Sequence, residues 1–179
     1  MYAIAAKSFR VSTWLAVHQR VHTSPPITFD DFDPSVLEGH SLIYLCLHGL
    51  SGQDYLYGDE YATALSGDQI RSANLGGAIV YNAGCWGIGP ISDALLAAGA
   101  STVIADSDAN WAGWNWRGPT GANAFGKFFL RGLHKGWSTG GAFQYAYDSY
   151  SEQARSSYDA ELLRTMCILG DTSIALGGT

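Results

Sequence analysis

The stretch Leu42-Ile43-Tyr44-Leu45-Cys46-Leu47-His48-Gly49 indicates both the class of fold and the place of a site. It is an apolar run with the length and the aromatic and β-branched content of a buried strand. A second such run, Ala78-Ile79-Val80-Tyr81-Asn82-Ala83-Gly84, ends in Cys85-Trp86-Gly87. Buried parallel strands present their carboxyl ends to the ligand-binding edge of an open α/β sheet. If the two strands are neighbours, we therefore expect the imidazole of His48 and the thiol of Cys85 to meet at that edge.

The rest of the chain alternates between strand-like and helix-like segments. Short apolar runs predict further strands at 2–6, 102–105 and 173–176. The spacing of apolar residues predicts helices near 10–22, 68–75, 90–98, 122–134, 139–154 and 159–166. Such alternation is typical of one α/β domain over residues 1–179, a sandwich with a mostly parallel sheet.

Three connecting regions are expected to lie outside these elements. Residues 28–39 are acidic and predict a surface loop with one helical turn. Residues 50–67 and 106–121 are rich in glycine and aromatic side chains, and the first of them has room for a small hairpin. Both are longer than ordinary connectors, which indicates functional loops.

Composition narrows the class of protein. The chain has 179 residues, 47% of them apolar and 15% charged, with a net charge of −6. Without a run of lysines and arginines, a nucleic-acid partner is not expected. No apolar stretch is long enough for a bilayer span, and the start lacks a basic region followed by an apolar one, so we expect a soluble, cytoplasmic protein that does not bind membranes. Three widely spaced cysteines favour a reducing compartment over a disulfide framework.

The residues around Cys85 permit nucleophilic catalysis. Gly84 and Gly87 leave room for a substrate, and a helix predicted to begin shortly afterwards would lower the pKa of the thiol. His48 is suited to act as general base and then to protonate the leaving amine. The backbone N–H groups of Gly49 and Cys85 are candidates for an oxyanion hole.

The other cysteines and histidines fit structural roles. Cys46 and Cys167 lie within apolar runs and are expected in the core. His18, His22 and His40 have no motif around them and are expected at the surface, while His134 would end a helix. No pair of these side chains has the spacing of a zinc site, so neither a metal nor another cofactor is expected.

The order of these features resembles the signature of caspase-like cysteine peptidases, above all the gingipain-type branch, with CHAT-type peptidases close to it. The resemblance covers roughly residues 40–176 and is carried by residues 45–49, 82–85, 103–105, 111–112 and 117–118, the glycines at 140–141, and Leu169-Gly170-Asp171-Thr172-Ser173-Ile174. This last stretch is similar to a closing Gly-Asp-Pro motif of the branch, with Thr172 in the place of proline.

The resemblance implies a caspase-like α/β/α sandwich and a cysteine endopeptidase. His48 and Cys85 match the catalytic dyad, which would act on a protein or peptide through a Cys85 thioester. Gly49 and Cys85 match the oxyanion donors. Partners that activate the enzyme, and its oligomeric state, are left open.

The resemblance also suggests residues of a substrate pocket. Trp111 matches a tryptophan that lines the pocket for the residue before the scissile bond. Asp106 and Asp108 are among the carboxylates that could face it and would select arginine or lysine. Arg117, if it pointed inward, would select an acidic residue instead.

Two other functions fit parts of the same pattern. Residues 83–87 approximate the nucleophile elbow of α/β-hydrolases, and 47–49 their oxyanion stretch. That fold needs a catalytic histidine after the nucleophile, a position that only His134 could fill. Alternatively, the long loops, with exposed aromatic residues such as Tyr55 and Trp116, could form the recognition surface of a non-catalytic binding module.

Overall fold

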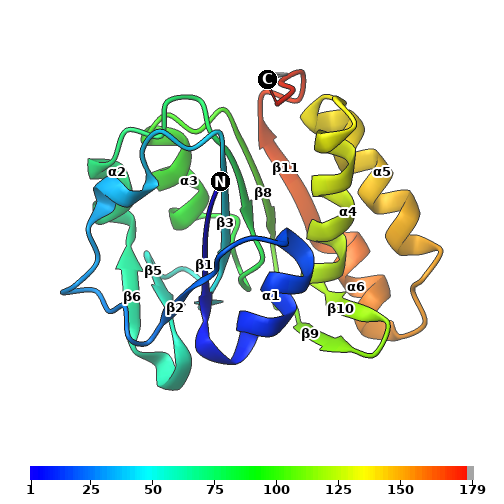
Figure 1. Ribbon diagram of the computed structural model, residues 1–179, viewed down its shortest axis with the longest axis horizontal. Helices are drawn as coiled ribbons and strands as arrows, with labels where there is room; N and C mark the ends of the chain where they lie inside the picture. The colour runs from blue at the N-terminus through cyan, green and yellow to red at the C-terminus, as the bar shows by residue number, and fades with distance from the viewer. Residues whose placement is uncertain (177–179) are drawn as a thin grey trace.

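The computed structural model describes residues 1–176 and contains a six-stranded central sheet in the order β11-β8-β7-β3-β1-β2 (Figure 1). Its strands are β1 (Tyr2–Ala6), β2 (His22–Ser24), β3 (Leu42–Cys46), β7 (Ile79–Asn82), β8 (Thr102–Asp106) and β11 (Met166–Gly170). All neighbours run parallel except β11, which is antiparallel to β8.

The remaining elements cover the sheet or extend from its edge. The helices are α1 (Arg10–Val17), α2 (Gly67–Ser72), α3 (Pro90–Ala97), α4 (Ala122–His134), α5 (Thr139–Ser151) and α6 (Ser157–Thr165), with 3-10 turns at η1 (Lys7–Phe9), η2 (Pro34–Leu37) and η3 (Asp59–Tyr61). A small sheet joins β4 (His48–Gly49), β5 (Tyr55–Tyr57) and β6 (Thr63–Ser66), and a hairpin joins β9 (Ala112–Asn115) to β10 (Gly118–Gly121).

The sheet is buried on both faces, which explains its nearly continuous apolar strands. In β3, Ile43 and Leu45 belong to a core shared with α2 and α3. The alternate residues Tyr44 and Cys46 belong to a second core, formed with α1, α4, α5 and α6. The helices therefore lie in two layers on opposite faces (Figure 1), and the expected α/β/α sandwich is confirmed.

Local signals set most helix boundaries. The side chains of Ser66 and Gln69 form a reciprocal capping box at the start of α2, and Pro90 occupies the first turn of α3. The first helix is shorter than the predicted 10–22, because it ends at Val17 and His18 turns into the left-handed conformation with φ of 51°.

Two sequence predictions about strands were wrong. The last strand of the sheet is Met166–Gly170, whereas the predicted segment 173–176 forms only an isolated bridge between Ser138 and Ala175. The predicted loop 106–121 contains the β9–β10 hairpin. Its exposed strands carry glycine and proline in place of an apolar pattern, and so they give no strand signal.

A buried hydrogen-bond network attaches α4 to the sheet. The hydroxyl of Tyr44 donates to Oδ1 of Asn123 at 2.7 Å, and the hydroxyl of Tyr81 donates to the carbonyl of Ala122 at 2.6 Å. Nδ2 of Asn123 donates to Ser12 at 2.7 Å. Satisfied buried polar groups of this kind specify one packing of the helix on the sheet.

The strand order has a topological switch point between β1 and β3. The chain passes from β1 to β2 on one side of this point, and from β3 to β7 and β8 on the other. Ligands of open α/β sheets bind outside the carboxyl ends of the strands at such a point. In Figure 1, β1 descends from the N-terminus to α1 at the lower edge, where the β9–β10 hairpin also lies. Among residues 1–176, no helix has the length and apolarity to cross a bilayer.

Candidate active site

His48 and Cys85 follow neighbouring parallel strands in matching positions. Residues Leu42 and Leu45 of β3 pair with Ile79 and Asn82 of β7. The N–H of Ala83 still donates to the carbonyl of Leu45 at 2.7 Å beyond the end of β7. Beyond the last pair the two segments stay adjacent, because Gly84 lies against the carbonyl of Leu47 and Gly49 lies against the carbonyl of Cys85.

Two glycines permit an unusually close approach of the backbones here. A Cβ on Gly49 would clash with the carbonyl oxygen of Cys85 and lie 3.1 Å from its carbonyl carbon. A Cβ on Gly84 would lie 2.6 Å from the carbonyl oxygen of Leu47. Glycine is therefore required at both positions for this geometry, independently of any chemistry.

The Cys85 thiol is held by Asn110, a residue that the sequence did not single out. The N–H of Asn110 donates to Sγ at 3.3 Å, and its Nδ2 donates to the carbonyl of Gly84 at 3.1 Å. Burial raises the pKa of the half-buried thiol above its ordinary value, and the negative charge of Asp106 raises it further. The Asn110 N–H opposes this shift without reversing it.

The lowered thiol pKa that we expected from a helix N-terminus is therefore wrong. Helix α3 begins only at Pro90, after a turn that separates it from Cys85. The favourable field of a helix end falls off within its first turn, so it does not offset burial at the thiol. At neutral pH the resting cysteine is the neutral thiol.

His48 lies between two aromatic rings. Its ring centroid is 4.9 Å from that of Phe9 and 5.5 Å from that of Tyr61. Burial lowers the pKa of the imidazole, although the carboxylate of Asp59 acts in the opposite direction. A neutral imidazole at neutral pH is the form that accepts a proton. Within residues 1–176, no hydrogen bond joins His48 to Cys85 in this resting arrangement.

Backbone strain is concentrated beside the same pair. Among the described residues, four non-glycine residues have positive φ. Trp86, with φ of 45°, directly follows Cys85, and Tyr61, with φ of 56°, contacts His48. Strain of this kind persists where the surrounding structure enforces it, and it clusters at functional sites.

One of the two expected oxyanion donors is free. In the described part of the chain, the backbone N–H of Cys85 forms no hydrogen bond with another residue. Gly49 is paired with Leu56 in the β4–β5 ladder. The N–H of Cys85 is thus available to a ligand at the carboxyl end of β7.

The structure gives the three expected pocket residues different environments. Asp106 is fully buried; its Oδ1 accepts the N–H of Asp108, and it has no exposed surface for a substrate contact. Asp108 is half-exposed, and its carbonyl accepts the N–H of Trp86 at 2.9 Å. Trp111 lines a surface groove that begins one residue after Asn110.

This groove is mainly cationic. It has a volume of about 560 Å³ and runs between the β9–β10 hairpin and the ends of α5 and α6. Arg117 and Arg155 line it. The acid in its lining, Asp159, already accepts hydrogen bonds from Tyr150 and from the N–H of Arg155. Arg117 stacks over the ring of Trp116, with 4.6 Å from Cζ to the ring centroid.

Sequence reasoning missed several residues that contact the pair. Phe9, Tyr61 and Asn110 come from three separate segments, and none stands in a recognisable motif. The length of the loop at 106–121 was the one available signal for Asn110. Over residues 1–176, no group of three or more His, Cys, Asp or Glu side chains is arranged to hold a metal ion.

Comparison with known proteins identifies the fold but no sequence family. No family model matches the chain, and no curated protein matches it. Among 14 matching chains of solved structures is the Arg-specific cysteine proteinase gingipain R (RGPB), with a TM-score of 0.66 and 14% identity. The match covers 87% of this chain and spans 38% of that proteinase. The chain therefore has the caspase-like fold of this cysteine proteinase.

Proposed function

We propose that the protein is a cysteine endopeptidase with Cys85 as nucleophile and His48 as general base and acid. The observation that carries the proposal is the close approach of Gly49 to the carbonyl of Cys85, just beyond the carboxyl ends of the paired strands β3 and β7. The fold shared with a cysteine proteinase supports it.

The proposed reaction proceeds in two halves. His48 takes the proton of the Cys85 thiol as Sγ attacks the scissile carbonyl, and the free N–H group of Cys85 stabilises the oxyanion. The imidazolium then protonates the leaving amine, which departs and leaves a thioester. A water molecule, deprotonated by His48, hydrolyses the thioester and returns the thiol.

The pKa directions favour a neutral thiol and a neutral imidazole in the resting enzyme. Burial raises the pKa of Cys85 and lowers that of His48, so a preformed thiolate–imidazolium pair is unfavourable. Proton transfer would then accompany attack on the bound substrate. Since His48 must be neutral, activity should rise with pH through an imidazole pKa below the ordinary 6.5.

We also propose a preference for acidic residues near the scissile bond. The groove that begins at Trp111 carries Arg117 and Arg155, whereas the carboxylate of Asp106 is fully buried. A peptide side chain entering this groove would meet guanidinium groups. The preference would therefore differ from that of the Arg-specific proteinase with the similar fold.

A fluorogenic peptide library that varies the residue before the scissile bond tests the proposal. Wild type should cleave, and Cys85→Ala and His48→Ala should lose at least about 10³-fold in kcat/KM. Cys167→Ala, at a half-buried cysteine on β11, is the matched control and should retain activity. Cleavage that survives in Cys85→Ala contradicts the assignment.

The alternative α/β-hydrolase is disfavoured by the position of His134. Helix α4 starts beside the site, because the N–H of Ala122 donates to the carbonyl of Trp111. His134 is the last residue of this helix, about 18 Å away along its axis.

A non-catalytic binding module remains the second candidate, because Trp114 and Trp116 of the hairpin are 59% and 86% exposed. Such a module would bind peptides equally well in wild type and Cys85→Ala and cleave them in neither.

A further inference from the structure

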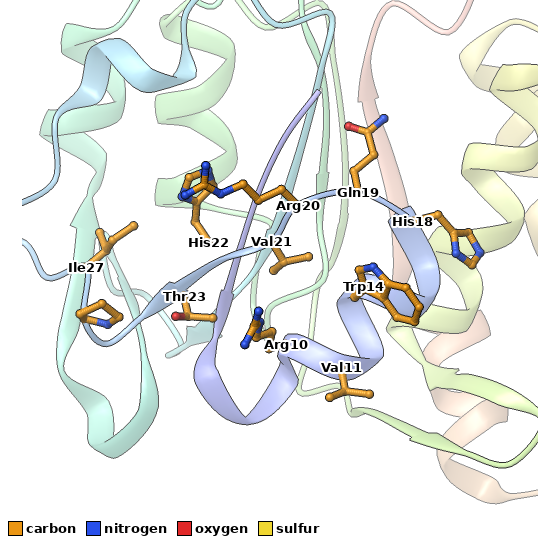
Figure 2. A pocket seen from close by; sticks show the side chains of 11 residues that line it. Arg10, Val11, Trp14, His18, Gln19, Arg20, Val21, His22, Thr23 and Ile27 are labelled. Carbon is orange, nitrogen blue, oxygen red and sulfur yellow. The ribbon is translucent and has the colours of Figure 1, made fainter.

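A broad hollow of about 980 Å³ lies beside α1, outside the site described above. It is lined by Arg10, Val11, Trp14, His18, Gln19, Arg20, Val21, His22, Thr23, Pro26 and Ile27. Figure 2 shows Trp14 and His18 on the α1 side, Arg20 on the segment before β2, His22 at the start of β2, and Arg10 at the start of α1. Its volume is at the upper end of the roughly 300–1,000 Å³ of ligand pockets.

The charge of the hollow is opposite to that of the whole chain. The net charge of the protein is −6, yet two arginines and two histidines line the hollow and no acidic residue does. Across residues 1–176, neither guanidinium forms an ion pair or a side-chain hydrogen bond. Arg20 is close enough to lower the pKa of His22, in addition to the effect of burial. The two arginines thus present charge that the fold itself does not neutralise.

Apolar surface is interleaved with these charges. Trp14 is 51% exposed and Val11 is 46% exposed, one helical turn apart on the same face of α1. Ile27 lines the hollow from the opposite side, after β2. The ring of His22 is fixed by stacking on Tyr2, with centroids 5.0 Å apart and an interplanar angle of 16°. The hollow therefore combines an apolar surface with two guanidinium groups that have no ion-pair partner among residues 1–176.

We propose that this hollow binds an acidic peptide segment that also carries apolar side chains. Carboxylates of the segment would pair with Arg10 and Arg20, which offer planar, bidentate donors. Its apolar side chains would cover Trp14 and Val11. This binding does not depend on the peptidase activity proposed above.

The pattern favours a peptide over a nucleic acid. Nucleic-acid binding draws most of its affinity from many phosphate contacts. Two arginines within an acidic protein supply few such contacts, and the net charge of −6 repels a long polyanion. Apolar side chains alternating with carboxylates, by contrast, match both the charges and the exposed Trp14 and Val11.

Fluorescence anisotropy with a fluorescein-labelled peptide of alternating glutamate and leucine tests the proposal. All measurements use a Cys85→Ala background, in which the proposed peptidase cannot cleave the probe; the peptide should bind this protein, and binding should weaken with added salt. The double variant Arg10→Gln/Arg20→Gln should weaken binding about tenfold, as expected for the loss of two exposed ion pairs. Trp14→Ala should weaken it as well. Arg131→Gln, at an exposed arginine on α4 that also lacks an ion pair, is the matched control and should leave binding unchanged.

Four results would contradict the proposal. A peptide with glutamine in place of glutamate should not bind, and if it bound as tightly as the glutamate peptide, the arginines would have no role. Equal affinity with and without the Arg10→Gln/Arg20→Gln substitutions would place the peptide elsewhere. Tighter binding of single-stranded DNA, with competition against the peptide, would assign the hollow to a nucleic acid. Full competition by millimolar inorganic phosphate would indicate a simple anion site.

Discussion

Replacing Gly49 with alanine should disturb the candidate site and the stability of the fold together. The added methyl would clash with the carbonyl oxygen of Cys85, a backbone atom that a rotamer change cannot move. Carbon atoms pack at about 3.5–4.0 Å, so the chains at positions 49 and 85 must separate by about 1 Å or more. Overpacking of this kind costs about 1–3 kcal/mol. A displacement of about 1 Å between reacting groups can cost about 10²-fold in rate.

Urea unfolding, followed by tryptophan fluorescence, measures the first effect on Gly49→Ala. The second is measured as kcat/KM on the best peptide from the library. Gly141→Ala is the matched control, because a Cβ there would lie in ordinary contact, 3.5 Å from Ser138, within helix α5. Alanine should be neutral or stabilising at that position. A Gly49→Ala protein as stable as wild type would refute the close approach of the two backbones. A destabilised variant with undiminished kcat/KM would refute the catalytic role of this geometry.

Three further perturbations follow from the structure. Asp106→Asn removes a charge that raises the pKa of Cys85, so a larger fraction of the thiol should be thiolate at pH 8 and iodoacetamide should label it faster. Asp30→Asn, at an exposed position, is the control and should be labelled at the rate of wild type. The pKa of Asp106 is raised in the folded state, so at pH values above the unfolded pKa of 3.8 the folded protein binds more protons than the unfolded chain and loses stability as pH rises. Asp106→Asn should therefore raise Tm at pH 7 but not below pH 3. An unchanged Tm at pH 7 would contradict the raised pKa. Gly126→Ala places a Cβ 2.5 Å from Oη of Tyr44 and should cost about 1–3 kcal/mol of unfolding free energy, and a value within error of wild type would contradict the packing of α4. Arg117→Gln should reduce the preference for glutamate in the peptide library about two- to fivefold, the contribution of an exposed ion pair, and an unchanged preference would argue against the groove as the substrate pocket.

The buried strands were the most predictable part of the fold. Leu42–Cys46 and Ile79–Asn82 appear in the sequence as apolar runs because helices cover both faces of the sheet. Elements at the rim were less predictable. Met166–Gly170 is itself an apolar run, but it follows helix α6 without a break, so the sequence did not separate it from the helix and the strand was placed at 173–176 instead.

The candidate site also has a part that the sequence predicted and a part that it did not. His48 and Cys85 stood out because each ends an apolar run, and the strand pairing that was expected of those runs is confirmed. The predicted lowering of the Cys85 pKa was wrong. The shift depends on the burial of the thiol and on the charge of Asp106, and neither can be judged without knowing which residues are in contact. Asn110 was missed because 25 positions separate it from the thiol that it holds.

The sequence by itself therefore determined the layers of this protein and the two strand ends at which chemistry is expected. Hydrophobic burial depends on the local pattern of apolar residues, and that pattern can be observed directly in the sequence. Only the tertiary structure decided that Phe9, Tyr61 and Asn110 contact the pair, that the charge of Asp106 acts on the thiol, and that Arg10 and Arg20 border one hollow. Hydrogen bonds and charges act through space, between residues whose separation along the chain says little about their distance in the fold.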